Sequence, residues 1–248
     1  MDGDGHRVIA RRGVGGSPWT WAAAAVLPVA FLAVFFAWPV AALVARGFVV
    51  DGSLSLAGVQ EVLAAPRTWR ILGQTFSQAV LGTAFSVLLG VPGAYVLYRL
   101  RFPGRRLARA VVSVPFVLPT VVVGVAFQSL LAPTGLLGGL HLQETMTAIV
   151  AALVFFNYSI VVRTVGVLWS RLDPRAEDAA RSLGAGRLRV LTTVTLPALT
   201  PAIASAAALV FLFCASAFGV VLVLGGESYG TIETEIWYQT TQLLDLPA

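Results

Sequence analysis

The sequence contains no lysine, because all 17 of its basic residues are arginines. This absence excludes a Walker-type phosphate loop, which needs a lysine ammonium, and it excludes catalysis through a lysine Schiff base. The chain has one cysteine, Cys214, and two histidines, His6 and His141, that lie far apart in the sequence. An intramolecular disulfide is therefore excluded, and we expect no metal site and no bound cofactor in this chain.

Charged residues are also scarce. They make up 12% of the chain, against about 25% in typical soluble domains, whereas hydrophobic residues make up 57%. This composition is typical of a membrane protein, so the lipid bilayer is its first partner. In a soluble chain the net charge of +5 would suggest nucleic-acid binding, but in a membrane protein arginines first report topology. We expect no nucleic-acid partner.

Long intervals without charge locate the membrane spans, since a helix needs about 20 apolar residues to cross the hydrocarbon core. The sequence predicts an all-α, polytopic membrane helix bundle over residues 19–224. The first apolar run is too long for the core of a signal peptide, so we expect it to remain as an anchor. The five predicted helices cover residues 19–45, 71–98, 110–131, 146–168 and 196–224.

The distribution of arginines predicts the orientation of the chain. With a cytoplasmic N-terminal tail (1–18), the segments 99–109 and 169–195 also lie inside, and these three segments hold 13 of the 17 arginines. Only Arg46, Arg67 and Arg70 lie in outside segments. Because positive charge is retained on the cytoplasmic side, the sequence predicts a multi-pass protein of the plasma membrane with its N-terminus in the cytoplasm.

Two outside segments have their own signals. Ser55 could cap a short helix that ends before Pro66, although an ordinary loop is equally compatible with this stretch. Gly225 and Gly226 should end the fifth helix. The remaining residues, 225–248, are too apolar for a free tail, so we expect a surface-packed or re-entrant external element before a missing sixth helix.

The cytoplasmic segment between the fourth and fifth predicted helices has good helix signals. Asp173 can act as the N-cap and Pro174 fits the first helical position. Glu177 and Asp178 lie near the positive end of the helix dipole, and Gly184 can adopt the left-handed conformation that ends a helix. These residues predict a helix of about ten residues. Such a short helix needs packing against the bundle or a partner.

This segment resembles the EAA signature of permease subunits in ATP-binding-cassette (ABC) importers. The signature reads EAA, three residues, G, nine residues and I-x-L-P, and here Asp178-Ala179-Ala180, Gly184 and Val194-Thr195-Leu196-Pro197 have the same spacing. Asp178 stands where the family usually has Glu, although Glu177 precedes it, and Val194 replaces Ile. Similar runs upstream extend the resemblance to most of the chain and imply the importer permease (MetI-like) fold.

The resemblance implies a function without chemistry in this chain. ATP would be bound and hydrolysed by a separate cytoplasmic ATP-binding subunit, an external protein would bind the solute, and a second permease half or subunit would complete the pathway. Runs such as Phe155-Phe156-Asn157 most resemble thiamine and ferric-iron permeases, which implies one of these solutes. The residues implied to couple to the ATPase are Glu177, Asp178, Ala179, Ala180, Gly184, Leu196 and Pro197.

Four polar residues within the predicted spans are candidates to line the pathway: Gln128, Asn157, Tyr158 and Arg163. For the first three, hydrogen bonding between helices is an alternative role. Arg163 lies near the cytoplasmic end of its helix and could extend its side chain to the interface instead. A carrier or scaffold not coupled to ATP hydrolysis is the alternative function, but a proton-coupled carrier would need acids or histidines that the five spans lack.

The orientation can be tested by cysteine labelling in intact cells. A cysteine replacing Asp51 should react with a membrane-impermeant thiol reagent, whereas cysteines replacing Arg105 or Gly184 should be protected until the membrane is permeabilised. The parent chain, with Cys214 alone, gives the background. Strong labelling at position 105 or 184 in intact cells would refute the predicted orientation.

Overall fold

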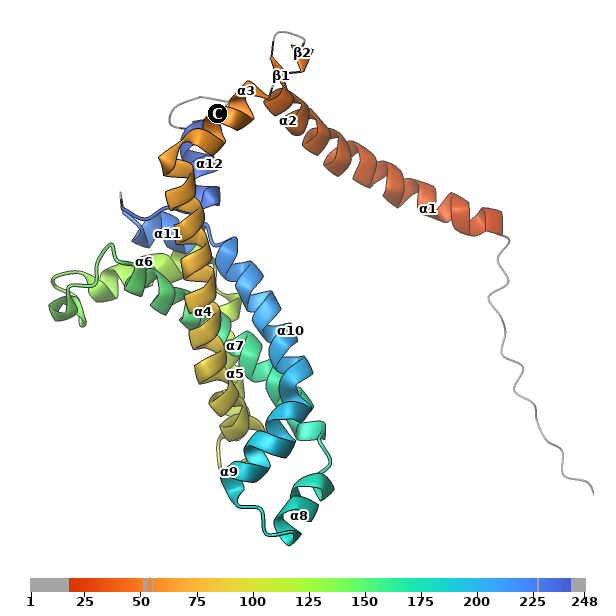
Figure 1. Ribbon diagram of the computed structural model, residues 1–248, viewed down its shortest axis with the longest axis vertical. Helices are drawn as coiled ribbons and strands as arrows, with labels where there is room; N and C mark the ends of the chain where they lie inside the picture. The colour runs from red at the N-terminus through yellow and green to blue at the C-terminus, as the bar shows by residue number, and fades with distance from the viewer. Residues whose placement is uncertain (1–17, 51–52, 55, 227, 242–248) are drawn as a thin grey trace, which may run out of the picture. The chain divides into compact units, whose positions relative to one another are not determined.

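The computed structural model describes residues 18–50, 53–54, 56–226 and 228–241 (Figure 1). The chain divides into two compact units, one of residues 1–62 with 246–248 and one of residues 63–245. The first unit contains α1 (Pro18–Leu32), the π-helical segment η1 (Ala33–Ala37), α2 (Trp38–Phe48) and the short hairpin of β1 (Val49–Val50) and β2 (Ser53–Leu54). The helix α3 (Ala57–Ala64) leads into the second unit.

The first predicted span is confirmed as a continuous helical run. Ala24–Ala45 is long and apolar enough to cross a membrane, and its large side chains, such as Leu27 and Phe35, are exposed. Exposed apolar side chains suit a helix surrounded by lipid or by a partner subunit. The short helix predicted before Pro66 is confirmed as α3, while its proposed cap, Ser55, lies outside the described residues.

The second unit is organised around three long helices. These are α4 (Pro66–Tyr98), α7 (Met146–Arg171) and the run from Arg187 to Ala215 that contains α10 (Leu196–Ala215). The helix α4 begins five residues before the predicted start at 71, because Pro66 fits the first helical turn and needs no N–H partner there. The helix α7 extends three residues beyond the prediction, and Thr145 caps it by accepting from the Ala148 N–H.

The structure divides the helix predicted at 110–131 into two. The structure has α5 (Arg105–Val117) and α6 (Thr120–Leu131), which are bent by 102° at the break between them. Pro119 explains the break, because its ring disfavours a helical conformation at Leu118, which is extended, and it supplies no N–H. The pair is thus a broken span or a re-entrant loop.

The prediction of a helix at 196–224 is wrong at both ends. The helical run begins at Arg187 with α9 (Arg187–Val190) and the π-helical segment η3 (Leu191–Thr195), so the loop predicted at 169–195 is shorter. It ends at Ala215, and a separate short helix, α11 (Gly219–Leu224), follows. Pro197 has no N–H to donate to a helical hydrogen bond. The wider π turn before it allows the proline to lie inside the helical run. The predicted end at the glycine pair is confirmed for α11, since Gly226 has a positive φ of 56°.

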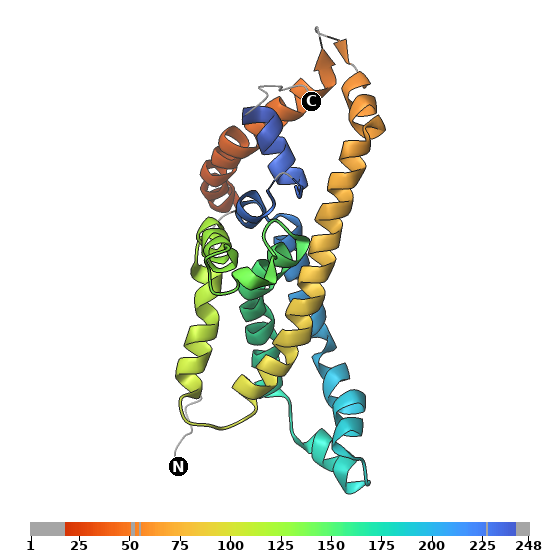
Figure 2. The same ribbon diagram turned by 90° about the vertical axis from the view of Figure 1, so that its left-hand side faces the viewer.

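The helix α12 (Ile232–Thr241) packs against the start of α4, at the end of the unit opposite to the short helix α8 (Arg175–Ser182) (Figures 1 and 2). Arg67 and Glu235 form an ion pair with an Nε to Oε1 distance of 2.8 Å. Desolvation raises the pKa of the Glu235 carboxyl, but hydrogen bonds from Arg67 and Gln239 together with the positive charges of Arg67 and Arg70 lower this pKa overall. Within the segment predicted after residue 225, the helix α12 thus packs on the bundle, whereas residues 242–248 lie outside the described part of the chain.

Small residues let the long helices approach closely. A Cβ atom at Gly90 of α4 would lie 2.6 Å from the Val161 Cβ of α7, so no side chain fits there. Around this contact the core consists of buried apolar side chains from α4, α7 and α10. Membrane helices commonly use such small residues, because close van der Waals packing replaces the hydrophobic driving force between helices in lipid.

Gly90→Ala should therefore destabilise the bundle by roughly 1 to 3 kcal/mol, because the new methyl group overlaps Val161. The measurement is thermal unfolding of the purified chain in detergent. Gly73→Ala, on the same helix, is the matched control, since nothing lies within 4 Å of the added atom. Equal unfolding temperatures for both variants would contradict the close contact.

Candidate functional site

The helix α8 forms as its sequence predicts. The Asp173 carboxylate accepts a hydrogen bond from the Arg175 N–H at 2.9 Å, which satisfies one free donor of the first turn. At the other end Gly184 has a φ of +84°, and the Ala185 N–H donates to the Ala180 carbonyl at 3.1 Å. This pair of features is a Schellman motif, so the predicted left-handed stop at Gly184 is confirmed.

Glu177 anchors α8 to the two neighbouring long helices. Its Oε2 lies 3.0 Å from the Arg99 guanidinium, directly after α4, and its Oε1 accepts from the Thr195 hydroxyl at 3.1 Å, directly before α10. Only 12% of the Glu177 side chain is exposed, so solvent screens these contacts weakly. The carboxylate therefore connects three parts of the bundle at one point.

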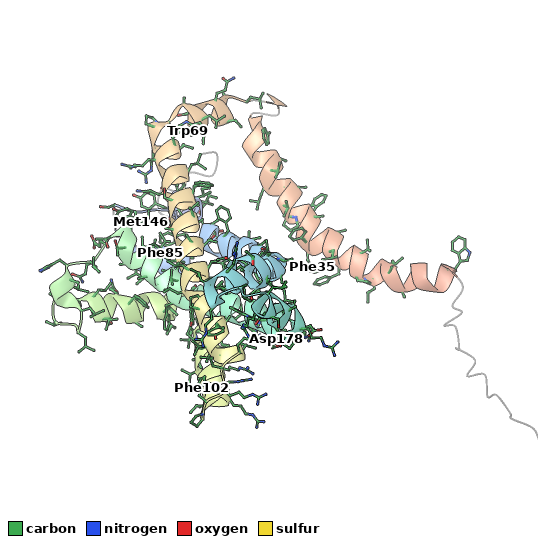
Figure 3. The ribbon with its side chains drawn as sticks, turned by 60° about the horizontal axis from the view of Figure 1, so that its bottom comes forward. Phe35, Trp69, Phe85, Phe102, Met146 and Asp178 are labelled. Carbon is green, nitrogen blue, oxygen red and sulfur yellow. The ribbon has the colours of Figure 1, made fainter. Side chains whose placement is uncertain are left out.

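Asp178, the acid that aligns with the signature, does not share this position. Its side chain is 66% exposed and pairs only with Arg181, at 3.4 Å, on the surface of α8 (Figure 3). Exposed pairs of this kind contribute about 0 to 1 kcal/mol. The less exposed acid of this segment is thus Glu177, the residue before the aligned one.

The α8 segment and the start of the next helix expose apolar and small residues. Ala179 and Gly184 are exposed, and Leu183 is 90% exposed between them. Leu188, at the start of the next helix, is 73% exposed. We call Ala179, Leu183, Gly184 and Leu188 the apolar coupling face. The sequence analysis missed both leucines, although large apolar residues within an arginine-rich loop are a signal for a docking surface.

Two predicted coupling residues, Leu196 and Pro197, belong to a different element. They begin α10, and Leu196 is partly buried. They therefore lie beside the Glu177 contact through Thr195 rather than on the apolar coupling face. The coupling role of every residue in the predicted set stays a prediction.

A cavity of about 1460 Å³ opens beside the Glu177 anchor. It lies between α4, α7, α8 and the start of the α9 to α10 run, and its lining includes Arg99, Arg187 and Trp169. The Trp169 ring packs against Tyr95 with centroids 5.4 Å apart, while its buried Nε1 has no hydrogen-bond partner among the described residues. This cavity borders α8 at Glu177 and Arg181.

The four predicted pathway residues occupy different environments. Asn157 is fully buried and donates to the Leu153 carbonyl and, at 3.5 Å, to the Cys214 sulfur of α10. Tyr158 is half-buried and lines an apolar groove between α4, α5 and α7. Gln128 on α6 and Arg163 on α7 are exposed. In this conformation Asn157 has the interhelical role, and the pathway role of all four stays a prediction.

A buried polar residue that the sequence analysis missed is Gln78. It lies on α4, is 1% exposed, and donates from its side chain to the Cys214 carbonyl at 3.0 Å. The signal for it was a glutamine in the middle of an apolar run, where an unpaired amide would be costly. Gln78, Asn157 and Cys214 together connect α4, α7 and α10 in the core.

Within the described part of the chain, no three His, Cys, Asp or Glu residues come together as metal ligands would. The arrangement instead offers mechanical contacts: an acid that joins α8 to two long helices, and an exposed apolar face on the same helix. These features suit the transmission of movement from a partner.

A family model described as "Binding-protein-dependent transport system inner membrane component" matches residues 82–247. The matched region begins within α4 and includes α8 and α10. It thus contains the Glu177 anchor and the apolar coupling face.

The chain is similar to permease proteins of two named transport systems. The chain is 34% identical over 180 residues to the sulfate transport system permease protein CysT of Salmonella typhimurium, a match that covers 70% of this chain and 65% of the relative. The chain therefore spans somewhat less than two thirds of that relative. It is 28% identical over 225 residues to the putative 2-aminoethylphosphonate transport system permease protein PhnU of the same species, covering 86% of this chain and 79% of the relative.

Solved structures show the same fold. A bacterial ABC transporter involved in the import of the acidic polysaccharide alginate matches with a TM-score of 0.79 and 15% identity, over 92% of this chain and 87% of that chain. The MetNI methionine ABC transporter in inward-facing conformations matches with a TM-score of 0.55 and 20% identity, over 74% of this chain and 87% of that chain. The predicted all-α, MetI-like permease fold is confirmed.

The two acids of α8 should differ sharply on substitution. Glu177→Gln removes the charge that holds Arg99 and Thr195, and hydrogen bonds to charged groups contribute about 1.5 to 3 kcal/mol each. Hydrogen exchange of the α8 amides in the purified chain should therefore speed up by tenfold or more. Asp178→Asn, the matched control, should change the exchange little, and equal effects of the two changes would rule out Glu177 as the anchor.

Proposed function

The chain belongs to the family of binding-protein-dependent transport system inner membrane components, and from this premise we propose that it is the transmembrane subunit of an ATP-driven importer of an oxyanion. The observation that carries the proposal is the position of Glu177, which joins α8 to α4 and α10 while the apolar coupling face stays exposed. A helix in this position can receive force from a partner and pass it to two membrane helices.

The partner proposed for the apolar coupling face is a separate ATP-binding subunit on the cytoplasmic side. Leu183 and Leu188 supply apolar contact area, and the small residues Ala179 and Gly184 allow close approach. ATP would be bound and hydrolysed in that subunit, because this chain has no lysine for a phosphate loop of its own. The two proteins would thus divide chemistry and transport between them.

The coupling step follows from the contacts of Glu177. When the ATP-binding subunit displaces α8, the carboxylate transmits the displacement to Arg99 at the cytoplasmic end of α4 and to Thr195 at the start of α10. Both helices continue through the core, where Gln78 of α4 contacts Cys214 of α10. The two long helices then move together, and the pathway opens alternately to the two sides.

The rest of the transporter is also proposed. An external solute-binding protein would deliver the solute, as in the alginate transporter that was solved in complex with a periplasmic protein. A second permease half or subunit would complete the pathway, and the exposed apolar side chains of Ala24–Ala45 leave ample surface for it. The complex would lie in the plasma membrane with the N-terminus of this chain in the cytoplasm.

For the solute we propose a tetrahedral oxyanion. Sulfate and 2-aminoethylphosphonate, the solutes in the names of two relatives, share a tetrahedral group of anionic oxygens. The expectation of ferric iron or thiamine from short sequence runs has no support among these names. Arg163 on α7 is exposed and would bind the anion on the pathway. Gln128 and Tyr158 would line the same pathway with polar groups.

The alternative is a membrane carrier or scaffold subunit that is not coupled to ATP hydrolysis. In that case the arginines of the α8 segment would only keep it in the cytoplasm, and the apolar coupling face would have no partner. Co-purification with the cognate ATP-binding subunit and stimulation of its ATPase activity separate the two functions. Uptake of radiolabelled sulfate, with ferric iron and thiamine as competitors, identifies the solute.

The coupling proposal predicts that Gly184→Val or Ala180→Trp abolishes ATPase association and uptake while membrane insertion stays intact. Valine at a φ of +84° is strained by on the order of 1 kcal/mol or more, and a bulky residue in a close contact costs roughly 1 to 3 kcal/mol. Gly139→Val is the control, because nothing lies near the added atoms and its φ is not positive. Normal co-purification and uptake in both coupling variants would reject the proposal.

A further inference from the structure

Three polar side chains, Gln74, Thr75 and Gln78, lie on one side of α4 in the half of the helix that is farthest from α8 (Figures 1 and 2). Gln78 and Thr75 are 1% and 6% exposed, and Gln74 is half-buried. A buried amide or hydroxyl without a partner is costly, so the partners of these side chains show what they do. Gln78 bonds to the Cys214 carbonyl near the end of α10 at 3.0 Å. The other two bond further along the chain.

Gln74 and Thr75 hold the turn that leads into α12. The Gln74 amide uses both of its ends: its Nε2 donates to the Ser228 carbonyl at 3.1 Å, and its Oε1 accepts from the Gly230 N–H at 3.3 Å. The Thr75 hydroxyl accepts at 3.2 Å from the Ile232 N–H, one of the donors that the first turn of α12 leaves free. These bonds go to backbone atoms, so they fix the path of the chain itself.

An ion pair extends this attachment along α12. Arg67 of α4 contacts Glu235 twice, with an Nε to Oε1 distance of 2.8 Å and an Nη2 to Oε2 distance of 2.9 Å. A forked pair of this kind fixes direction as well as distance. We call residues 228–241 the α12 segment. Three side chains of α4, from Arg67, Gln74 and Thr75, therefore fasten the α12 segment to this helix.

The opposite end of α4 is fastened to α8. Arg99, the residue after α4, lies 3.0 Å from the Glu177 carboxylate. Between its two ends α4 is one helix, Pro66–Tyr98, in which Pro92 removes only one backbone hydrogen bond. Gly90, two residues before that proline, packs closely against α7 and supports the helix at this point. A single helix therefore connects α8 with the α12 segment.

We propose that α4 carries the α12 segment as one body, so that a displacement of α8 reaches the far end of the bundle through α4. Independent movement of the α12 segment would break its bonds to Gln74 and Thr75 and leave buried polar groups unpaired, which is costly. The inference rests on the proposed function, in which an ATP-binding subunit displaces α8. It deepens that function, because in the proposed orientation the α12 segment lies on the external side, where the solute enters. Arg67, Gln74 and Thr75 are then positioning residues for transport.

The first test locks α4 to the α12 segment. Arg67→Cys with Glu235→Cys creates two neighbouring thiols for a bifunctional maleimide, while Cys214 is buried and offers no competing site. The measurement is ATP-dependent uptake of radiolabelled sulfate into proteoliposomes that hold this chain with its ATP-binding subunit, second permease and solute-binding protein. If α4 and the α12 segment move together, the bridged protein should retain at least half of the uptake of the unbridged protein. A bridge that abolishes uptake would show that the two must move relative to one another, and would overturn the proposal.

The second test removes the attachment and then restores it. Gln74→Leu with Thr75→Val takes away the three hydrogen bonds to the α12 segment at nearly constant side-chain size. Uptake should fall at least tenfold, while co-purification with the ATP-binding subunit stays unchanged. When the same changes are added to the two cysteines, the bridge should recover at least half of the lost uptake. Ser77→Ala is the matched control, since this hydroxyl bonds to the Gly73 carbonyl within its own helix.

Hydrogen exchange in the purified chain separates the attachment from the transport function. In the variant with Gln74→Leu and Thr75→Val, the amides of α12 should exchange at least tenfold faster, and those of α8 at an unchanged rate. Unchanged exchange of α12, full uptake in this variant, or uptake that stays low after bridging would overturn the proposal. A parent chain that neither binds an ATP-binding subunit nor supports uptake would refute the proposed function instead, and the exchange rates would still report whether α4 holds the α12 segment.

Discussion

One partly buried carboxylate holds the α8 end of the second unit together. Glu177 contacts residues that lie 78 and 18 positions away in the sequence, so it joins α8 to helices from two separate parts of the chain. A short helix such as α8 is marginal in water by itself, and its position depends on these contacts. Arg99 and Thr195 contact the same carboxylate. If α8, α4 or α10 moves, the other two helices must therefore move with it or lose their contact.

The membrane imposes the second constraint on this architecture. Backbone groups in the hydrocarbon region must be paired internally, so non-helical backbone is tolerated only where protein covers it. The breaks after α5 and after α10 satisfy this rule, because the half-helices α6 and α11 that follow them pack against each other. Their contact is close: a Cβ atom at Gly124 of α6 would lie 3.0 Å from the Val223 Cβ of α11. The two irregular segments therefore cover one another.

Capping residues and long apolar runs were sufficient to predict the helices α8, α4 and α7, because these helices depend on residues that are close together in the sequence. Asp173, Pro174 and Gly184 lie directly beside the helix that they begin or end, and the existence of α8 followed from them. Apolar length likewise located α4 and α7. The length of an apolar run does not show, however, whether the chain changes direction within it. The 102° turn at Pro119 lies inside an interval that is apolar throughout. The sequence also did not show that Glu177, and not Asp178, contacts Arg99, since this depends on which face of α8 meets Arg99.

The π-helical segment η3 gives α10 a property that its apolar composition does not suggest. Pro197 and Pro201 donate no N–H, and the wide turn at Leu191–Thr195 precedes the first of them, so fewer backbone hydrogen bonds hold this part of the helix straight. Bending is therefore cheapest next to the Thr195 contact, around Pro197 and Pro201. The helix is stiff where it crosses the bundle and compliant where it meets α8, and its two ends can change their angle to one another while both keep their packing.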